Sequence, residues 1–575
     1  MTDAKSATNR DRRHPGLRED SRLTAELIQQ YVESGQWVDR TLRDLLSAAA
    51  SMYPDRIAGV DVVLGAAGRR VADYRELDAR AHRMACGLAS LGVRPGDSVV
   101  VMLPNCVDFA AMIFAINEIG AVFSGIPVAY GEREVEIILR RTRARVVVVP
   151  HRLRNADHLA MVRRLRLHLD NLAHVVVAGA DSPDELSPST GEVMLESLLT
   201  LPEHGYAPHD PAALAHIGFT SGTTGEPKGV MNTDQTLQRV MMNFVDHLGV
   251  DAFGDTVVNL VASPVGHHTG FLWGVLLGAY LGATNVYLDR WDPDFAATLI
   301  REQGVTQMFG APTFLLDLMR TNLVGDVSCP LRLVVVAGAP VPRELPVTGA
   351  GALGAFICPA WGMTEWGIGI ACSPRLPAAA LDSDGAPIGS CEVRIRSQHG
   401  LAALVGEQGE LQIRGPGLFL GYLERPDATF ESIDVDGWFT TGDVAVERAD
   451  GFIELRGRDK DIVIRGGENV PVVEIESLLF AHPDIVDVAV IGLPDERLGE
   501  RACAVVVVRP GAEVSLQILC DYLLEKGVSK HFLPESHVTV EELPKTVSGK
   551  IRKVELRLAL SKSSSGPSHT NGISQ

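Results

Sequence analysis

Hydrophobic residues in the first three quarters of the chain follow two alternating patterns. Short runs of β-branched residues, typical of buried strands, occupy residues 98–103, 146–150, 175–178 and 333–337. Between such runs, segments such as 74–91 carry apolar residues at helical spacing. A chain that alternates strands with helices in this way is predicted to fold as an α/β protein with mainly parallel sheets.

Two changes of pattern divide the rest of the chain. Strands at 393–396 and 409–414 follow each other closely with turn residues between them, which predicts a small antiparallel or barrel-like subdomain. The charged stretch 456–461 then interrupts the strand pattern, so we expect a solvent-exposed connector and the main domain boundary there. A compact α+β domain is predicted beyond it from a helix at 473–482, strands at 486–491 and 503–508, and a helix at 515–526. The expected units are a disordered arm at 1–23, an N-terminal domain at 24–457, a hinge at 458–461, a mobile C-terminal domain at 462–560 and a disordered tail at 561–575.

Residues 271–288 are apolar enough to suggest a membrane span. Several glycines and the polar Thr284 and Asn285 interrupt the stretch. We therefore predict a buried helix followed by a strand.

The composition of the chain favours a protein that acts on small molecules over one that binds nucleic acid or membranes. The chain has 575 residues, 46% of them hydrophobic, which is enough for at least two domains with large cores. A net charge of −19 argues against broad binding to nucleic acid or to an anionic membrane, although that sum still allows a local basic patch. The eight cysteines form no Cys-x-x-Cys pair and the N-terminus is polar. We expect reduced thiols, no signal peptide and a cytoplasmic protein.

A glycine- and hydroxyl-rich loop at 219–231 has the composition of a phosphate-binding site. Its glycines let backbone N–H groups turn toward an anion, its hydroxyls add donors, and its lysine adds positive charge. The loop lacks the Gly-Lys-Ser/Thr step of a Walker A motif, which disfavours a generic NTPase, and a plain surface turn is the simpler alternative. The candidate phosphate-binding residues are Thr220, Ser221, Gly222, Thr223, Thr224 and Lys228.

A second cluster, at 359–365, combines an aromatic ring, a hydroxyl and a carboxylate. Trp361 can stack on a purine, Thr364 can donate a hydrogen bond to a phosphate oxygen, and Glu365 offers a hard oxygen ligand to Mg²⁺. Taken alone, Thr364 and Glu365 could equally be the cap and first-turn acid of a helix.

Three further segments with charged residues complete the candidate site. Asp443 follows a glycine turn and could accept hydrogen bonds from both ribose hydroxyls, although a turn-forming aspartate is the simpler alternative. The segment 457–461 contributes Arg458 and Lys460 at the expected boundary. Lys550 follows Ser-Gly near the end of the chain, where a lone lysine is ordinarily a solvated charge.

In their order and spacing, these five motifs resemble the adenylate-forming superfamily of acyl- and aryl-CoA synthetases, nonribosomal adenylation domains and luciferases. The resemblance runs from about Trp37 to Leu560. The segments 34–42, 466–470 and 532–535 are most similar to free-standing carboxylate:CoA ligases, including those for cyclohexanecarboxylate, fatty acids and hydroxybenzoates. Such a chain would have a large N-terminal domain of αβ-layered sheets with a β-barrel-like subdomain, and a mobile α+β C-terminal domain.

The resemblance implies a role for each motif. The loop from Thr220 would hold the pyrophosphate end of ATP, Thr364 and Glu365 would contact the α-phosphate and Mg²⁺, and Asp443 with Arg458 would bind the ribose. Lys550 would bridge the substrate carboxylate and the α-phosphate. Further nucleotide contacts would come from Gly338, Ala339, Trp361, Gly362 and Met363.

The resemblance also implies two half-reactions in one site. The acid would first become an acyl-adenylate. The C-terminal domain would then rotate about Lys460, and a loop containing Gly467 would admit the pantetheine arm of coenzyme A. The implied cofactors are ATP, Mg²⁺ and coenzyme A.

The acyl pocket is expected beside His267, the position of the family's gate residue, with His268, Gly310 and Gly338 around it. A buried structural histidine is the alternative for His267. No aspartate stands where amino-acid-activating relatives hold the substrate amine, which favours an acid without an α-ammonium group. Hydroxybenzoate ligases usually carry an amide where His268 stands, which disfavours an ortho-hydroxyaryl acid.

Two departures leave alternatives open. Asp234 replaces a frequent histidine after the phosphate loop, and Ile464 replaces a frequent lysine in the thiol-side loop. An acid:CoA ligase is the leading interpretation. The alternatives are a ligase that loads an acyl carrier protein, an enzyme of only one half-reaction, and a nucleotide-binding protein without catalysis. We expect a monomer or homodimer.

Overall fold

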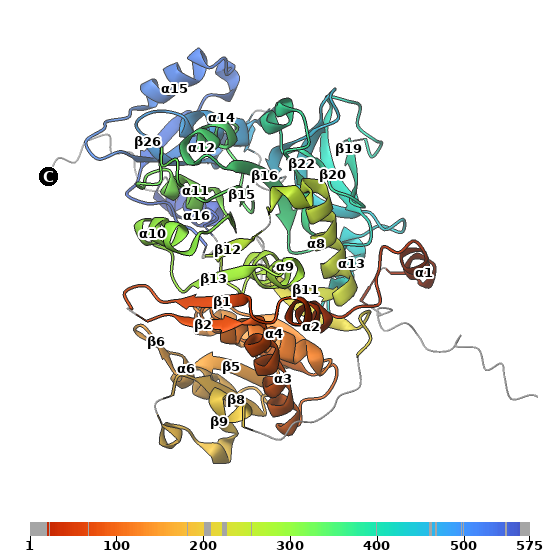
Figure 1. Cartoon of the computed structure of the whole chain (residues 1–575). Helices are drawn as coiled ribbons and strands as arrows, with labels where there is room; N and C mark the ends of the chain where they lie inside the picture. Colours follow the sequence, from red (N-terminus) through yellow and green to blue (C-terminus); the bar gives the residue numbers. More distant parts are fainter. Residues whose placement is uncertain are drawn as a thin grey trace, which may run out of the picture.

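The computed structural model describes residues 20–563 except 22, 67, 181, 201–208, 221–226, 255, 398, 459–462, 466–467, 496, 498 and 547–548. Figure 1 shows the described chain as stacked sheets and helices, with the C-terminal domain in blue beside α11 (Pro312–Leu318) and α12 (Leu345–Leu353).

The largest sheet within the described residues has nine strands in the order β18-β17-β16-β15-β14-β12-β13-β1-β2. Strands β13, β12, β14, β15 and β16 are parallel, so their C-terminal ends share one edge of the sheet. The strands are β1 (Ile57–Val62), β2 (Arg70–Asp73), β12 (Val258–Val261), β13 (Thr284–Leu288), β14 (Gln307–Gly310), β15 (Leu333–Val336), β16 (Phe356–Met363), β17 (Gly367–Ala371) and β18 (Ala386–Pro387).

The second large sheet has eight described strands in the order β21-β11-β10-β4-β3-β5-β8-β9. Its strands are β3 (Ser98–Val101), β4 (Val122–Gly125), β5 (Val146–Pro150), β8 (His174–Ala178), β9 (Glu192–Met194), β10 (Leu214–Thr220), β11 (Lys228–Thr233) and β21 (Gly421–Tyr422). The runs predicted as buried strands at 98–103, 146–150, 175–178 and 333–337 are β3, β5, β8 and β15, which confirms the α/β prediction.

Alternating side chains place helices on both faces of these sheets. In β3, Val99 and Val101 belong to the central core, whereas Val100 packs in a separate core under α5 (Glu132–Arg141) and α6 (His158–Arg166). Because successive strand residues point to opposite faces, an all-apolar run such as this must be covered on both sides.

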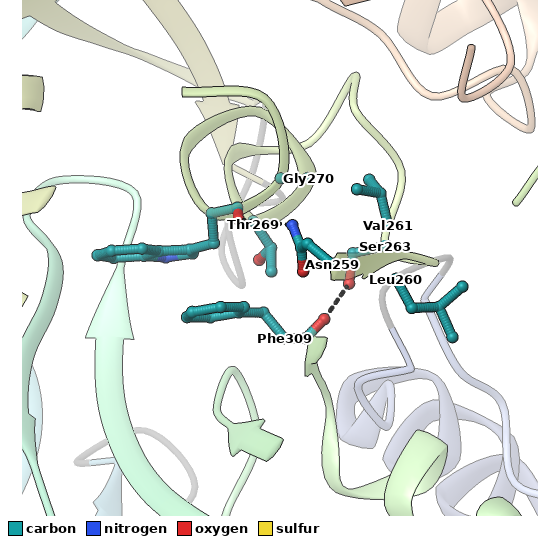
Figure 2. Close-up of a pocket in the computed structure, with 9 residues that line it drawn as sticks. Asn259, Leu260, Val261, Ser263, Thr269, Gly270 and Phe309 are labelled. Carbon is teal, nitrogen blue, oxygen red and sulfur yellow. Dashed lines mark hydrogen bonds between the residues drawn. The ribbon is translucent and has the colours of Figure 1, made fainter. Parts of the chain in front are cut away.

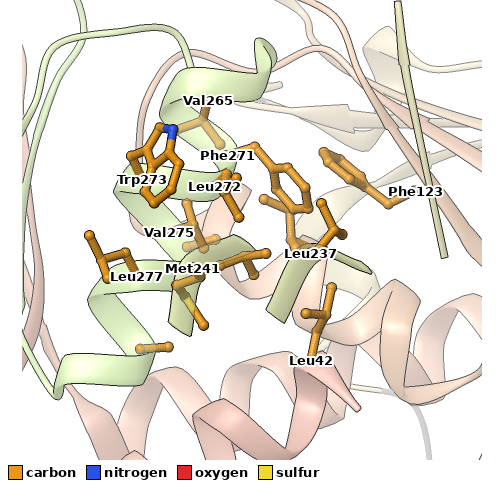
Figure 3. Packing of buried hydrophobic residues seen from close by; sticks show 14 of the residues in the cluster. Leu42, Phe123, Leu237, Met241, Val265, Phe271, Leu272, Trp273, Val275 and Leu277 are labelled. Carbon is orange, nitrogen blue, oxygen red and sulfur yellow. The ribbon is translucent and has the colours of Figure 1, made fainter. Parts of the chain in front are cut away.

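The central core lies between the two large sheets. It contains α4 (Val107–Glu118), whose residues from Phe109 to Asn117 are all buried, and the π-helix η4 (Gly270–Leu276) with α9 (Leu277–Leu281). In Figure 3, Phe271 points toward Phe123 of β4, whereas Trp273 lies on the other side of the π-helix. Residues 271–288 are therefore buried helix followed by strand β13, as predicted.

The remaining helices cap or cover these layers. Asp73 caps α3 by accepting from the Glu76 amide, and Thr233 forms a capping box with Thr236 at the start of α8. The helices of the large domain not yet named are α1 (Ala25–Glu33), α2 (Leu42–Met52), α3 (Tyr74–Ser90), α7 (Leu195–Leu198), α8 (Asp234–Leu248), α10 (Pro293–Gln303) and α13 (Pro426–Ser432).

Two smaller sheets follow. The antiparallel subdomain contains β19 (Glu392–Arg396), β20 (Gln408–Arg414), β22 (Phe439–Glu447) and β23 (Ile453–Arg458). The C-terminal domain contains β24 (Val463–Arg465), β25 (Glu468–Val470), α14 (Val472–Phe480), β26 (Ile485–Asp495), β27 (Gly499–Val508), α15 (Leu516–Glu525), β28 (Ser536–Thr539) and α16 (Lys553–Ser563). Its own apolar core supports the predicted α+β domain.

Two segments beside the predicted boundaries have more contacts with the large domain than the sequence pattern indicated. Arg456 to Arg458 continue strand β23 and are not an exposed connector, because Arg458 is the register partner of Asp443 in β22. The expected arm ends earlier than residue 23, because Asp20 is buried and its carboxylate accepts a hydrogen bond from the Glu424 amide.

All eight cysteines lie in the described residues and are free thiols. A search of the described residues finds no helix with the length and apolar character needed to cross a membrane.

Candidate active site

The candidate site lies at the shared edge where the parallel strands of the nine-stranded sheet end. Ligands of open α/β sheets commonly bind at this edge, because the loops that leave neighbouring strands converge there. Here the loop after β12 carries His267, the end of β14 carries Gly310, the loop after β15 carries Gly338, and β16 ends with Met363.

The phosphate-loop prediction falls largely on undescribed residues. Ser221, Gly222, Thr223 and Thr224 lie outside the described residues. Thr220 and Lys228 are described, and they are register partners at the ends of the antiparallel pair β10 and β11. The segment between them therefore joins two paired strands.

Thr364 and Glu365 do not start a helix. They lie in the turn between β16 and the antiparallel β17, which excludes the helix-cap alternative. A Cβ added to Gly218 of β10 would lie 2.9 Å from Thr364 Cγ2. Thr364 thus packs close to the backbone of the strand that leads into the phosphate loop.

Glu365 is buried and has a partner that the sequence did not reveal. The Tyr422 hydroxyl donates to Glu365 Oε1 at 3.0 Å, and Lys228 Nζ lies 4.5 Å from the centre of the Tyr422 ring. Burial raises the pKa of Glu365, and the Tyr422 hydrogen bond and the charges of Arg458 and Lys228 oppose that rise. A bound cation would offset the cost of burying the charged form of this carboxylate.

Asp443 is held from two sides. Trp361 Nε1 donates to Asp443 Oδ2 at 2.9 Å, and Arg458 Nε lies 3.2 Å from Asp443 Oδ1. Burial raises the pKa of Asp443, whereas Arg458, Trp361 and Lys550 lower it. The indole of Trp361 therefore positions the predicted ribose-binding acid, a role that the sequence analysis did not assign to it.

Lys550 is brought to this site by the C-terminal domain. It follows a tight turn in which Gly549 has φ +85° and the Thr546 amide donates to the Lys550 carbonyl at 2.7 Å. A Cβ on Gly549 would lie 2.7 Å from Thr313 Oγ1, so the turn packs directly on the wall of the large domain. The charge of Lys550 influences the pKa values of both His267 and Asp443.

The two candidate gate histidines have different surroundings. His267 Nδ1 accepts from the Thr269 amide at 3.4 Å; desolvation, with a smaller contribution from Lys550, lowers its pKa to about 4. His268 is buried, with its ring 5.7 Å from that of His216 and 6.2 Å from that of Phe271, and neither of its nitrogens has a hydrogen-bond partner among the described residues. Both histidines are therefore neutral near pH 7.

The other predicted residues are placed as follows. Position 310 has room only for glycine, because a Cβ there would lie 2.4 Å from the Phe314 ring. Gly338 has φ +85° and is exposed beside Ala339. A Cβ added to Gly362 would lie 2.1 Å from the Gly367 carbonyl oxygen. Lys460 and Gly467 lie outside the described residues.

Asp234, which departs from the family pattern, is a structural residue. It is fully buried, and its carboxylate accepts from the Asn117 amide nitrogen at 2.8 Å and the Leu42 backbone at 3.2 Å. His209 Nε2 lies 2.8 Å from the same carboxylate. These contacts join α8 to α2 and α4, away from the phosphate loop.

Comparison with known proteins identifies the family. A model for the AMP-binding enzyme matches residues 46–423, and a model for the AMP-binding enzyme C-terminal domain matches residues 474–550. The chain therefore belongs to the AMP-binding enzyme family, whose members are adenylate-forming ligases.

Relatives and solved structures cover nearly the whole chain. It is 31% identical to the medium-chain fatty-acid–CoA ligase of Escherichia coli, over 92% of each chain. It is 33% identical to the salicyl-AMP ligase / salicyl-S-ArCP synthetase of Mycobacterium tuberculosis, also over 92% of each chain. The crystal structure of ATP-bound MatB from Rhodopseudomonas palustris aligns with a TM-score of 0.78 at 25% identity, covering 91% of this chain and all of that one (100%).

Proposed function

We propose that the protein is an ATP-dependent carboxylic acid:CoA ligase, which forms an acyl-adenylate and then an acyl-CoA, with release of pyrophosphate and AMP. The observation that carries this proposal is the position of Lys550. Lys550 follows Gly549, which packs against Thr313 of the large domain, and its charge acts on Asp443, on the predicted nucleotide side, and on His267, on the predicted acyl side.

The first half-reaction needs a cation at this position. A carboxylate resists nucleophilic attack because it is an anion with a very poor leaving group, and ATP is an anion as well. Lys550 would reduce the repulsion between the two and stabilise the charge that develops as the acid oxygen attacks the α-phosphorus and pyrophosphate leaves. Fixed charges of this kind commonly contribute about 3–4 kcal/mol to transition-state stabilisation.

Glu365 would hold Mg²⁺. Its carboxylate is buried, has the Tyr422 hydroxyl as a neutral partner, and carries a raised pKa that a bound cation would lower. When bound, Mg²⁺ would neutralise phosphate charge. Trp361 and Arg458 would hold Asp443 so that both its oxygens face the ribose hydroxyls in a fixed orientation.

The second half-reaction needs the C-terminal domain to move. In the described orientation, the turn at Gly549 packs against Thr313, and the charge of Lys550 acts on His267 on the predicted acyl side. A thiol that attacks the acyl carbon needs this space, so we infer that rotation at the predicted hinge, around Lys460, follows adenylation. The thiol would then form the thioester bond as AMP leaves with the former carboxylate oxygen.

Coenzyme A is the acceptor that we favour, and the name of the Escherichia coli relative supports it. The name of the mycobacterial relative supports a second candidate, transfer of the acyl group to a carrier protein.

An acid-dependent pyrophosphate-release screen tests the first half-reaction. Aliphatic, alicyclic and aromatic acids should be compared at fixed ATP and Mg²⁺, with Lys550→Ala as the matched inactive control. The best acid is then supplied with coenzyme A or with phosphopantetheinylated carrier proteins. Acyl-CoA as the faster product supports the proposal, acyl-carrier as the only product supports the second candidate, and no pyrophosphate release with any acid contradicts both.

A further inference from the structure

One face of helix α14 in the C-terminal domain packs on the large domain. The Arg343 backbone amide donates to Ser477 Oγ at 3.1 Å. A Cβ added to Gly457 of β23 would lie 3.2 Å from Val473 Cγ2. Val473 and Ser477 are four residues apart, so they lie on the same face of the helix. Figure 1 shows α14 beside α12, which begins shortly after Arg343.

The surface that receives α14 is held together by a buried carboxylate. Arg343 Nη2 lies 2.6 Å from Asp384 Oδ2, and the Leu455 amide donates to the same oxygen at 2.8 Å. Asp384 is buried, so this contact fixes the loop after β15 against β23. The loop after β15 carries the predicted nucleotide contact Gly338, and β23 ends with Arg458. Helix α14 therefore packs on the two segments that flank the predicted nucleotide site.

The next residue along α14 connects the helix to the segment of Lys550. Glu476 Oε1 lies 2.6 Å from Lys553 Nζ and accepts a hydrogen bond from the Val490 amide at 2.6 Å. The side chains of Lys553 and Glu476 are only 13% and 12% exposed, so water screens this ion pair weakly. Lys553 begins α16, three residues after Lys550.

The backbone between Pro544 and Lys553 forms one compact turn. The Thr546 amide donates to the Lys550 carbonyl at 2.7 Å, and the Lys550 amide donates to Thr546 Oγ1 at 3.1 Å. The Arg552 amide donates to the Pro544 carbonyl at 2.8 Å. The ion pair at Lys553 therefore holds the whole turn, and Lys550 with it, at a fixed position relative to α14.

A buried ion pair is a poor source of stability compared with apolar packing, but it can restrict two elements to one arrangement. Lys550 needs such a restriction, because its ammonium is a point charge on a flexible four-carbon stem. A displacement of about 1 Å in a reacting or stabilising group can cost about 100-fold in rate.

We propose that α14 positions Lys550 for adenylation. Ser477 fixes where the helix rests on the large domain, and Glu476, through Lys553, fixes where the turn of Lys550 lies. Ser477, Glu476 and Lys553 are positioning residues, because they act through Lys550. This inference rests on the proposed ligase function and adds residues that serve its first half-reaction alone.

The test measures the two half-reactions separately in Glu476→Gln and Ser477→Ala. Glutamine keeps the acceptor for the Val490 amide and removes only the charge. Single-turnover pyrophosphate release should slow by about tenfold in Glu476→Gln and about fivefold in Ser477→Ala. Thioester formation from supplied acyl-adenylate and coenzyme A should stay within about threefold of the wild type, because it does not use Lys550. This second rate also shows that each preparation is folded.

Glu535→Gln is the matched control. Glu535 lies 2.5 Å from Arg465, and its Oε2 accepts from the Ala502 amide at 3.1 Å, so it repeats the contacts of Glu476 with partners in β24 and β27. Its variant should keep the wild-type rate of adenylation. Ser477→Thr retains the hydroxyl and should restore adenylation to within about threefold of the wild type.

A double variant tests the ion pair as a unit. Lys553→Met should slow adenylation as much as Glu476→Gln, and the two together should cost no more than about twofold beyond the larger single effect. Losses that multiply would mean that the two residues act independently, and the link from α14 to Lys550 would be wrong.

The outcomes separate this inference from the ligase proposal. Equal loss of both half-reactions in Glu476→Gln and Ser477→Ala would mean that these contacts only stabilise the domain. Wild-type adenylation in both variants would mean that Lys550 needs no such support. Either result overturns this inference and leaves the ligase function standing. If no acid supports pyrophosphate release by the wild type, the ligase proposal and this inference fail together.

Discussion

The buried His268 predicts a measurable acid sensitivity of the fold. Its ring is enclosed by His216 and Phe271, and neither nitrogen has a partner among the described residues. Desolvation, aided by the neighbouring His267, lowers the pKa of His268 from 6.5 to about 3. The folded protein therefore resists protonation at a position where the unfolded chain accepts a proton.

The sign and size of the effect follow from linkage. The unfolded state binds the proton with a pKa of 6.5. The free energy of unfolding therefore decreases as the pH falls below 6.5, and it keeps decreasing until the pH reaches the lower pKa of the folded state. Between pH 7 and pH 5, protonation of the histidine stabilises the unfolded state by about 2 kcal/mol. This figure is the change in the proton-binding term, about 1.4 decimal-logarithm units for a pKa of 6.5, multiplied by about 1.36 kcal/mol. The folded histidine gains almost none in this range.

The perturbation is His268→Leu, and the assay is urea unfolding at pH 7 and pH 5. Between these two pH values, the variant should lose about 2 kcal/mol less unfolding free energy than the wild type. Comparing two pH values within each protein cancels any packing difference caused by leucine. His168→Leu, at an exposed position, is the control and should keep the wild-type pH dependence. Equal pH dependence in His268→Leu and the wild type would refute the reasoning.

Three further substitutions test separate parts of the structure. Tyr422→Phe removes the hydroxyl that donates to Glu365 and should slow pyrophosphate release about tenfold in single-turnover kinetics, with the fold intact. Asp234→Ala removes a fully buried carboxylate that accepts from Asn117 and Leu42 and lies 2.8 Å from His209 Nε2; because these donors lose their acceptor, the unfolding free energy should fall by about 3–5 kcal/mol in urea titrations. Gly549→Ala should slow adenylation at least about tenfold, because the added Cβ clashes with the large domain and φ is positive. Gly527→Ala, with similar φ but open space around it, is its control and should retain activity.

Each of these has a contradicting outcome. Unchanged adenylation in Tyr422→Phe would mean that Glu365 needs no such partner. A loss of under about 1 kcal/mol in Asp234→Ala would mean that water replaces its contacts. Equal rates for Gly549→Ala and Gly527→Ala would mean that the turn does not pack on the large domain during adenylation.

Most of the fold could be predicted because it depends on local patterns. All-apolar β-branched runs such as Val146–Pro150 require cover on both faces, and this requirement alone predicts a layered α/β protein. The antiparallel subdomain followed from closely spaced strands, and the α+β C-terminal domain from the helix and strand patterns after the charged stretch 456–461. The extent of β23 could not be predicted, because the charged step after Leu455 is stabilised by register with Asp443, a contact distant in sequence.

Less of the site could be predicted from the sequence, because several of its contacts also join residues that are distant in the sequence. The candidate residues Glu365, Asp443 and Lys550 carry charges within recognisable motifs, so their chemistry could be proposed from residue type. Tyr422 carries no such signal, because only folding places its hydroxyl on Glu365. The sequence around Asn259 predicts only a polar residue in a strand. The structure shows that Asn259 lines a small internal space (Figure 2) and that its Oδ1 has no hydrogen-bond partner among the described residues.

The central claim is that a cation from the C-terminal domain serves adenylation and then leaves the site. Lys550→Ala tests it most directly when the two half-reactions are measured separately: pyrophosphate release from acid and ATP, and thioester formation from supplied acyl-adenylate and coenzyme A. We predict a loss of at least about 100-fold in the first and a change of less than about threefold in the second. Equal loss of both half-reactions, or full retention of the first, would contradict the account.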